Sequence, residues 1–420
     1  MTDFPIMIYI VGSMLASLMA VRWVYFKVLK IAKDKNLVDN PDARKLQKSP
    51  VPVVGGLAVF FGMVLGLLLG ISLYGFWTDS IKGVAASILP IIMAMVLMLY
   101  AGTIDDILGL TPMARFAIEI LVILGIIYST GTCIDSLHGL WGIGHFSWYV
   151  AVPLTVFAGV GIINAINMVD GVNGLSTGLC TVCALMFGGI FLSAGDIANA
   201  MLAFTMAASL LPFLVHNVFG NSSRMFIGDA GTMVMGIQMT WFVISAMRTG
   251  SVLDASADSY CITALVVAIL SVPVADTLRV MAMRLLRGKS PFSPDRTHLH
   301  HAFVSVGISH SITALSEITI NILVVAIWFV AATCGTPLHC QLYLVVLTAA
   351  TLVWGTYFFL EHEHSTQGTK AQWLRVLSPK THFGSKEWWQ RISFFLDSPE
   401  YSEGERKNLR ERLDRKFMNH

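Results

Sequence analysis

The chain has 420 residues, of which 55% are hydrophobic and only 13% are charged. A soluble globular protein carries about 25% charged residues, so this composition excludes that class and favours a polytopic membrane protein. The formal net charge of +2 is uninformative alone, and we expect no nucleic-acid partner. We divide the chain into a membrane domain over residues 1–360 and a polar tail over residues 361–420.

Eleven apolar stretches are long enough to cross a bilayer, which takes about 20 residues. They lie near 5–29, 53–74, 84–103, 114–130, 147–168, 174–194, 196–216, 230–248, 260–285, 312–334 and 339–360. The first stretch keeps its charges at its C-terminal side and lacks a small-residue cleavage site, so we expect a retained span. The sequence therefore predicts an all-α polytopic membrane protein with about eleven transmembrane helices.

Lysine and arginine are concentrated in alternate loops. Of the 28 such residues, 25 lie in the loop after the first span, in the loops of Arg115 and Arg224, at or after the ninth span, or in the tail. Lys82 and Arg248 fall in opposite loops. The positive-inside rule therefore places the N-terminus outside and the tail in the cytosol. It also places the four polar motifs described next at the cytosolic face.

The first motif is the acidic pair Asp105-Asp106 at the end of the third span. One carboxylate could bind a metal or act as a base while the other orients a cation, or both could be solvated at a helix end. Arg115 follows, with Glu119 one turn later. The guanidinium could contact a phosphate, or it could form an ordinary i,i+4 ion pair.

The second and third motifs are rich in amides, acids and glycine. The segment Asn164–Gly174 holds three Asn and one Asp between two spans. Amide oxygens suit a hard cation and glycines let the backbone approach a phosphate, whereas the alternative is a turn at a helix end. Asp229, between Gly228 and Gly231, could bind Mg²⁺ or cap a helix.

Asp276 lies inside the ninth span, three residues before Arg279. An ionisable residue within a span indicates a functional group, and a buried local ion pair is the alternative. Pro273 predicts a kink in this span because it removes one backbone hydrogen bond.

The fourth motif, in the next inner loop, holds three histidines. His298, His300 and His301 follow Asp295 and Arg296. Their spacing is poor for a tetrahedral zinc site and no cysteine lies nearby. We therefore favour hydrogen bonding to a sugar or phosphate over metal binding.

Together these motifs resemble those of the polyprenyl-phosphate N-acetylhexosamine-1-phosphate transferase superfamily, and most of all its bacterial undecaprenyl-phosphate GlcNAc-1-phosphate transferases. The matching segments are Asp39 to Lys45, Pro52 to Gly56, Asp105-Asp106 with Arg115-Phe116 and Glu119, Asn164 to Gly174, Phe226 to Gly231, and Ser290 to His301. The resemblance implies Mg²⁺ dependence and transfer of a sugar-1-phosphate from a UDP-N-acetylhexosamine to undecaprenyl phosphate, with release of UMP. It also implies a bacterial cytoplasmic (inner) membrane.

The resemblance also implies roles for individual residues. Asn167 and Asp229 would hold Mg²⁺, Arg115 would occupy the phosphate-binding position, and Asn173 would face the uracil. Asp105 and Asp106 would be the essential acidic pair, as base, lipid-phosphate orienter or metal support. Further substrate contacts are expected from Lys48, Asn164, Asp170, Asp276, Asp295, and the sugar-reading loop with Arg296, His298, His300 and His301.

The sequence departs from the pattern at two places. Many relatives have Asp at Asn173, and many carry His where this chain reads Leu46-Gln47. Related enzymes that use other UDP-N-acetylhexosamines share the loop that ends at His301, so the sugar stays open, with GlcNAc favoured. A lipid or nucleotide-sugar transporter is the alternative from another class. Transporter sites lie near the midplane between repeated halves, whereas here we find no repeat and acids on one face.

Apolar residues recur at helical spacing in the tail: Trp388, Trp389, Ile392, Phe395 and Leu396. This pattern predicts a helix that lies in the headgroup plane, or one that packs on the protein's inner loops or on a second copy in a homodimer. Every chemical motif precedes Glu361, so we expect no catalytic group in the tail and no effect of its removal on the reaction.

Four of the six cysteines fall at or near the outer face: Cys133, Cys261, Cys334 and Cys340. Cys334 and Cys340 flank one short turn and are the pair that we expect to form a disulfide in an oxidising compartment.

Overall fold

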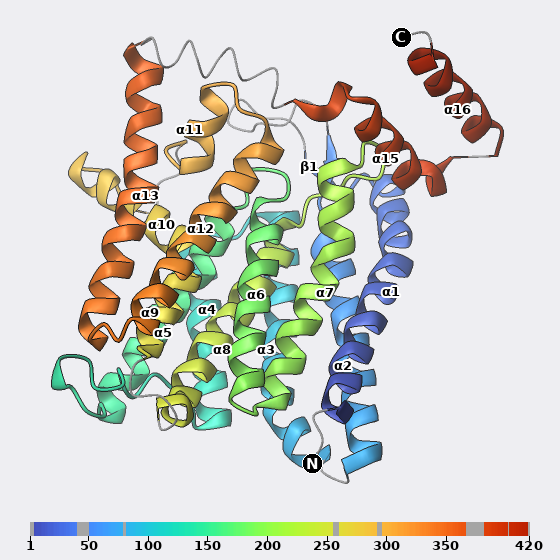
Figure 1. The fold of residues 1–420 in the computed structure, drawn as a ribbon. Coiled ribbons are helices and arrows are strands. Elements are labelled where there is room, and N and C mark those ends of the chain that lie inside the picture. The colour runs from blue at the N-terminus through green and yellow to red at the C-terminus, as the bar shows by residue number, and fades with distance from the viewer. Residues whose placement is uncertain are drawn as a thin grey trace.

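The computed structural model describes residues 4–39, 50–78, 81–254, 260–291, 296–366, 382–401 and 403–418. Within these ranges the chain is almost entirely helical (Figure 1). Two short strands, β1 (Val38–Asp39) and β2 (Val51–Pro52), pair antiparallel with Val38 opposite Pro52. The expected all-α fold is therefore confirmed.

Ten helices of the described part are long and apolar enough to cross a membrane. They are α1 (Phe4–Asp34), α2 (Gly55–Thr78), α3 (Ile81–Leu108), α4 (Pro112–Thr130), α5 (Trp148–Met168), α6 (Leu175–Ser193), α7 (Ile197–Phe219), α8 (Gly228–Asp254), α12 (His310–Thr333) and α13 (Leu338–Thr366). A bent pair, α9 (Ile262–Ile269) and α10 (Ser271–Leu286), makes an eleventh crossing when counted as one span. The protein is thus a multi-pass membrane protein with about the expected number of spans.

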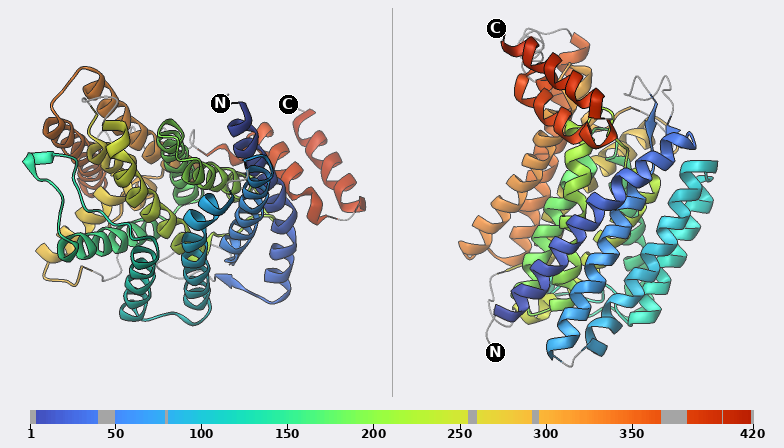
Figure 2. Two further views of the ribbon diagram at one scale, coloured as in Figure 1. Left: turned by 90° about the horizontal axis from the view of Figure 1, so that it is seen from below. Right: turned by 90° about the vertical axis from the view of Figure 1, so that its right-hand side faces the viewer.

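The remaining helical elements lie outside the spans. Helix α11 (Leu299–Ser305) precedes α12, and the short turn η1 (Leu140–Gly142) lies between α4 and α5. The tail forms η2 (Phe383–Ser385), α15 (Glu387–Asp397), η3 (Ser398–Glu400) and α16 (Glu403–Met418). The tail helices lie at the opposite end of the bundle from the N-terminus (Figure 2).

Helix α8 is the central element of the bundle. Its apolar stretch is completely buried, whereas α1, α4 and α13 bury less than a third of theirs. Helices α2, α3, α5 and α6 all pack against it. A lipid-facing helix needs apolar side chains all along its outer surface, so the less buried helices form the rim of the bundle and α8 supplies its core.

Two glycines allow neighbouring helices to approach the first turn of α8. A Cβ at Gly102 of α3 would lie 2.4 Å from the Cα of Ala230, and one at Gly56 of α2 would lie 2.4 Å from the Cα of Gly231. Backbones can approach this closely only where side chains are missing. The start of α8 is therefore fixed between α2 and α3.

The interruption predicted near Pro273 is present and is sharper than a kink. The chain breaks at Leu270, and α9 and α10 meet at 74°. Pro273 lies in the first turn of α10, where its missing N–H costs no helical hydrogen bond. Asn321 of α12 satisfies the exposed backbone, because its Oδ1 accepts from the Val272 N–H at 3.2 Å and its Nδ2 donates to the Ile269 carbonyl at 2.9 Å.

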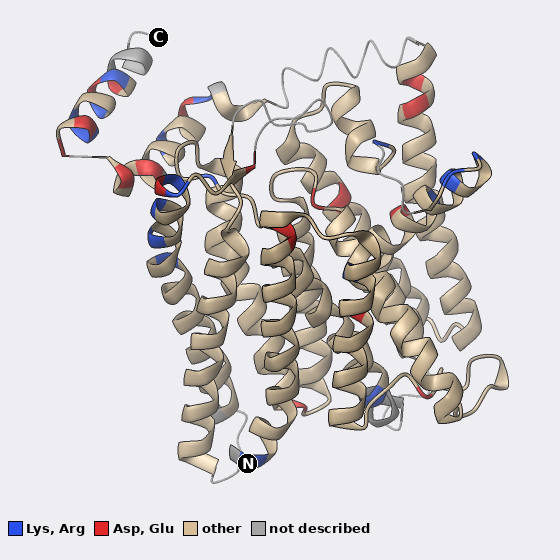
Figure 3. Ribbon diagram, turned by 180° about the vertical axis from the view of Figure 1, so that it is seen from behind, with Lys and Arg blue, Asp and Glu red and all other residues tan. Residues whose placement is uncertain are grey.

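Charged residues gather at one end of the bundle. Figure 3 shows most of the Lys, Arg, Asp and Glu of the described chain at the end opposite the N-terminus. The loops α3–α4, α5–α6 and α7–α8 all lie at this end (Figure 1). The prediction that the polar motifs share one membrane face is therefore confirmed, whereas the assignment of that face to the cytosol stays a prediction.

The predicted disulfide is not formed. All six cysteines are free thiols, including the exposed Cys334 and the half-buried Cys340. Cys334 caps the end of α12, while Cys340 already belongs to the first turn of α13. Each residue is thus held by its own helix, and the expectation of a Cys334–Cys340 bond is wrong.

We predict that Gly102→Ala destabilises the protein, because the new methyl group would overlap the backbone of Ala230. Such overpacking costs about 1–3 kcal/mol. Gly83→Ala is the matched control, since Gly83 lies on the same helix and an added Cβ would meet no heavy atom within 4 Å. Thermal unfolding in detergent should show a lower Tm for Gly102→Ala only. Equal Tm values for the two variants would contradict this packing argument.

Candidate active site

A pocket of about 1120 Å³ lies at the polar end of the bundle. Its wall comes from the ends of α3, α5 and α7, the start of α8, the α11–α12 turn and the tail. Seven of the residues predicted from the sequence line it: Asp105, Asp106, Asn167, Asp170, Asn173, Asp229 and His301. The fold therefore brings together groups from four separate motifs.

Arg115, in the second turn of α4, is the centre of an ionic network. Its Nη1 lies 3.2 Å from Asp105 Oδ2 and 3.6 Å from Asp229 Oδ1, and its Nε lies 3.3 Å from Glu119 Oε1. Asn164 donates to the other Glu119 oxygen at 2.6 Å. The remaining nitrogen, Arg115 Nη2, is buried and has no hydrogen-bond partner. A buried donor of this kind is one that a bound oxyanion would satisfy.

The two adjacent acids have different tasks. Asp105 contacts Arg115 and accepts from the Leu110 N–H at 2.7 Å. Asp106 accepts from the N–H groups of Asp229 and Ala230, at 2.8 and 3.1 Å. Asp106 therefore caps the first turn of α8 from another helix, a role that the sequence analysis left open for Asp229 instead.

A glycine makes this capping contact possible. Gly228 has a φ of +73°, which disfavours other residues. A Cβ at this position would lie 2.6 Å from Asp106 Oδ2. The glycine before Asp229 is thus required both by the backbone conformation and by the close approach of the acid.

Asn167 and Asp229 form a direct pair on the pocket wall. Asn167 Nδ2 donates to Asp229 Oδ1 at 2.5 Å and to Thr232 Oγ1 at 2.7 Å. The end of α5 and the start of α8 therefore meet at the two residues that the resemblance assigns to Mg²⁺.

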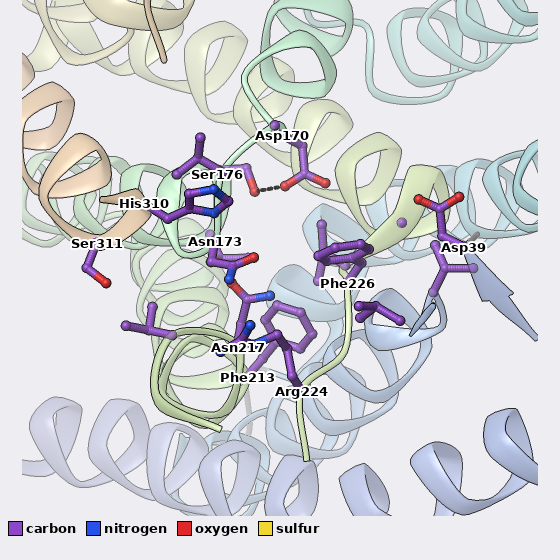
Figure 4. A pocket seen from close by; sticks show the side chains of 18 of the residues that line it. Asp39, Asp170, Asn173, Ser176, Phe213, Asn217, Arg224, Phe226, His310 and Ser311 are labelled. Carbon is purple, nitrogen blue, oxygen red and sulfur yellow. Dashed lines mark hydrogen bonds between the residues drawn. The ribbon is translucent and has the colours of Figure 1, made fainter. Parts of the chain in front are cut away.

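Asp170 lies in the loop after α5 and accepts from Ser176 Oγ at 2.5 Å (Figure 4). Its carboxylate faces the pocket but is surrounded by protein on its other sides. This desolvation raises the pKa of Asp170 to about 6, and the charge of Asp229 adds to the rise while Ser176 opposes it. Asp170 is therefore mostly ionised at neutral pH and becomes protonated below about pH 6.

Asn217 is a structural link that the sequence analysis missed. Its Oδ1 accepts from the Gly174 N–H at 2.7 Å, and its Nδ2 donates to the Met225 carbonyl at 2.7 Å. It thus joins the loop of Asn173 to the loop before α8, and Figure 4 shows it beside Asn173 and Arg224. The sequence feature that could have identified Asn217 is an amide side chain at the end of an apolar span.

Asp276 holds the start of the histidine loop. It is 2% exposed, accepts from Arg279 Nη2 at 2.6 Å, and lies 2.8 Å from His298 Nδ1. The Leu299 N–H also donates to it, at 3.2 Å. The local ion pair with Arg279 is therefore present, and the same carboxylate fixes α11 to α10.

The three histidines occupy different depths. His298 and His300 are buried, and only His301 of the three lines the pocket. His300 packs against Gly171, where a Cβ would lie 2.2 Å from its Nε2. Burial lowers the pKa of His300 well below its usual range, so its ring is neutral. His300 thus packs directly against the Asn164–Gly174 loop.

Six described residues that the sequence predicts for the site do not line the pocket: Arg115, Asn164, Asp276, Arg296, His298 and His300. Arg296 is exposed and does not line the pocket. Lys48 and Asp295 lie outside the described residues. Their contacts with a substrate, and those of Asp276, His298 and His300, stay predictions.

The tail also reaches the pocket. His382, Gly384 and Trp389 lie on its wall, although the sequence predicts no part of the tail in the site. Trp389 lies 4.5 Å from Phe219 between ring centroids. One residue of the apolar stripe therefore packs on the end of α7, whereas Trp388, Ile392 and Phe395 are exposed, and the headgroup-plane and second-copy arrangements stay predictions.

Fold and site together define a membrane enzyme with an acidic pocket at one end of its helix bundle, bordered by the Arg115 network. Residues 88–247 match glycosyl transferase family 4. The chain is 31% identical over 293 residues to the undecaprenyl-phosphate alpha-N-acetylglucosaminyl 1-phosphate transferase of Escherichia coli strain K12, which covers 68% of this chain and 73% of the relative.

Two further relatives agree. A probable undecaprenyl-phosphate N-acetylglucosaminyl 1-phosphate transferase of Bacillus subtilis is 31% identical over 311 residues, or 74% of this chain and 81% of the relative. The undecaprenyl-phosphate alpha-N-acetylglucosaminyl 1-phosphate transferase of Yersinia pestis is 30% identical over 291 residues, which is 68% of this chain and 74% of the relative. The chain belongs to glycosyl transferase family 4 and is a membrane phosphoglycosyltransferase. The resemblance inferred from the motifs is confirmed.

We predict that Arg115→Lys lowers turnover at least about 100-fold, since an ammonium cannot contact Asp105, Glu119 and Asp229 at once. The variant should stay folded. Arg248→Lys is the control, because Arg248 pairs with Asp196 at 3.6 Å and its side chain is 54% exposed. Initial rates and Tm of both variants test the prediction. Wild-type turnover in Arg115→Lys would rule out the central role of the guanidinium.

Proposed function

We propose that the protein transfers an N-acetylhexosamine-1-phosphate, with GlcNAc-1-phosphate favoured, from a UDP-sugar to undecaprenyl phosphate and releases UMP. The observation that carries this proposal is the Arg115 network, in which one cation lies among three carboxylates and keeps one buried nitrogen unpaired. The names of the relatives supply the donor sugar and the lipid acceptor.

The proposed reaction is a displacement at phosphorus. An oxygen of the lipid phosphate attacks the β-phosphorus of the donor and forms a new P–O bond. The bond from that phosphorus to the bridging oxygen breaks, and UMP leaves with its electron pair. The lipid phosphate is already a nucleophile, so no covalent enzyme intermediate is required. The protein's task is to position two phosphate groups and offset their repulsion.

The acidic pair divides this work. Both oxygens of the Asp106 carboxylate accept hydrogen bonds from N–H groups of α8, so we infer that Asp106 is a positioning residue for Asp229. Asp105 lines the pocket, and Arg115 pairs with it from behind the pocket wall. We infer that Asp105 orients the attacking phosphate, or accepts its remaining proton, through this contact.

We also infer that the enzyme uses Mg²⁺. Asn167 and Asp229 supply an amide and a carboxylate, and oxygen ligands are those that Mg²⁺ prefers. Mg²⁺ usually takes one or two carboxylates and completes its shell with substrate phosphates and water. A bound Mg²⁺ would neutralise charge on the donor pyrophosphate.

The proposed location is the cytosolic face of a bacterial inner membrane. The pocket end of the bundle is also the end where most Lys and Arg of the described chain gather (Figure 3). The positive-inside rule assigns such an end to the cytosol. UDP-sugars are made there, so the donor could enter from solvent while the lipid phosphate enters from the bilayer.

We predict that Asp229→Ala abolishes turnover while the protein stays folded, because the proposed metal site loses its only paired carboxylate. Asp135→Ala, in the loop between α4 and α5 at the other end of the bundle, is the control, since that side chain is 55% exposed. Release of UMP from UDP-GlcNAc in the presence of undecaprenyl phosphate would be measured over a range of Mg²⁺ concentrations. Near-normal Mg²⁺-dependent activity in Asp229→Ala would disprove the assignment.

A second prediction concerns the sugar. His301→Ala should raise the KM for UDP-GlcNAc about tenfold, as expected for one lost hydrogen bond, and leave inhibition by UMP unchanged. Ser305→Ala, on the exposed side of α11, is the control. Alanine variants of Arg296, His298 and His300 extend the test to the rest of the loop. Equal loss of donor and UMP affinity would mean that the loop is only structural.

A further inference from the structure

The segment Phe383–Tyr401 is anchored to the pocket end of the bundle by a buried carboxylate. Asp397, at the end of α15, is 2% exposed. It accepts from the backbone N–H groups of Asn221, Ser222 and Ser223, the last at 3.0 Å, and from Ser223 Oγ at 2.6 Å. Four donors on one carboxylate form a strong local anchor for the loop after α7.

Two more contacts hold the same segment. Ser393 Oγ donates to the carbonyl of Phe219, the last residue of α7, at 2.5 Å. Lys33 Nζ, near the end of α1, lies 2.8 Å from Glu400 Oε1 and also donates to the Ser222 carbonyl at 2.7 Å. The segment is thus tied to α1, α7 and the α7–α8 loop, which are all distant from it in sequence.

This anchoring brings one aromatic side chain to the pocket. Trp389 lies on the pocket wall, and its ring centroid is 4.5 Å from that of Phe219 and 6.2 Å from that of Phe383. Asn221, whose N–H donates to Asp397, lines the same pocket as Asn217 and Asn173. The tail therefore joins the part of the pocket that the end of α7 and the Asn173 loop form.

A guanidinium and an imidazole lie at this side of the pocket as well, since Arg224 and His310 both line it. An aromatic side chain with amides and a guanidinium around it matches a nucleotide, whose base is flat and whose phosphates are anionic. The acidic end at Asp105, Asp106 and Asp229 does not offer this combination.

We propose that Trp389 contacts the nucleotide half of the donor, and that Asp397 is the positioning residue that holds Trp389 on the pocket wall. This inference rests on the proposed function, because it takes the ligand to be a uridine nucleotide. It assigns to the tail a share in donor binding, and none in the chemical step.

The test is the binding of UMP and UDP-GlcNAc to the purified full chain, measured by calorimetry. Trp389→Ala should weaken the binding of both ligands by the same factor, about tenfold for one lost stacking contact. Trp389→Phe should recover most of the lost affinity. The KM for undecaprenyl phosphate should not change. Phe395→Ala is the matched control, since Phe395 lies on the same helix and is 66% exposed.

Asp397→Asn separates positioning from contact. It should weaken UMP binding about as much as Trp389→Ala does, and it should increase backbone hydrogen exchange over residues 387–397. The double variant should bind UMP as tightly as Trp389→Ala alone. Wild-type UMP affinity in Trp389→Ala, or a loss confined to the lipid acceptor, would overturn the inference and leave the proposed function intact. A wild-type protein that binds neither UMP nor UDP-GlcNAc would overturn both.

Discussion

The arrangement of the site depends on how the first turn of α8 is capped. The N–H groups at a helix start need hydrogen-bond acceptors. In a bundle that is surrounded by lipid, the protein itself has to supply them, because water is scarce. Asp106 of α3 accepts two of these groups, and Gly102 and Gly228 let the backbones approach. Asp229 follows directly in the capped turn. This one contact between α3 and α8 therefore sets the distances among the acidic pair, Arg115 and Asp229, the residue that we assign to Mg²⁺.

Charge balance links this geometry to the proposed chemistry. Arg115 is a single cation among Asp105, Glu119 and Asp229, so the cluster has an excess of negative charge when these groups are ionised. Two phosphate substrates would add about four more negative charges. Repulsion of this size in a partly buried site has to be offset by a cation that arrives with the substrate or before it. This is the physical reason for proposing a divalent ion here.

Most of the fold was predictable, because hydrophobic length and the placement of Lys and Arg follow directly from the chemistry of the bilayer. The same patterns located Asp105, Asn167 and Asp229 at one face. They could not show that Asp106 caps α8, since that contact depends on two helices meeting 123 residues apart in sequence. Nor could they separate His301 from the buried His300, or place Trp389 on the pocket wall, because those positions are set by tertiary packing.

The docked tail has a consequence for how the protein matures. Trp389 and Asp397 are translated after the eleven crossings found in the described part of the chain, counting the bent pair α9–α10 as one. A nascent chain whose spans are already in the bilayer would hold the acidic cluster but lack one wall of the pocket. Membrane insertion and completion of the site are therefore separate events, and a chain released just after α13 would be an inserted helix bundle with an incomplete pocket.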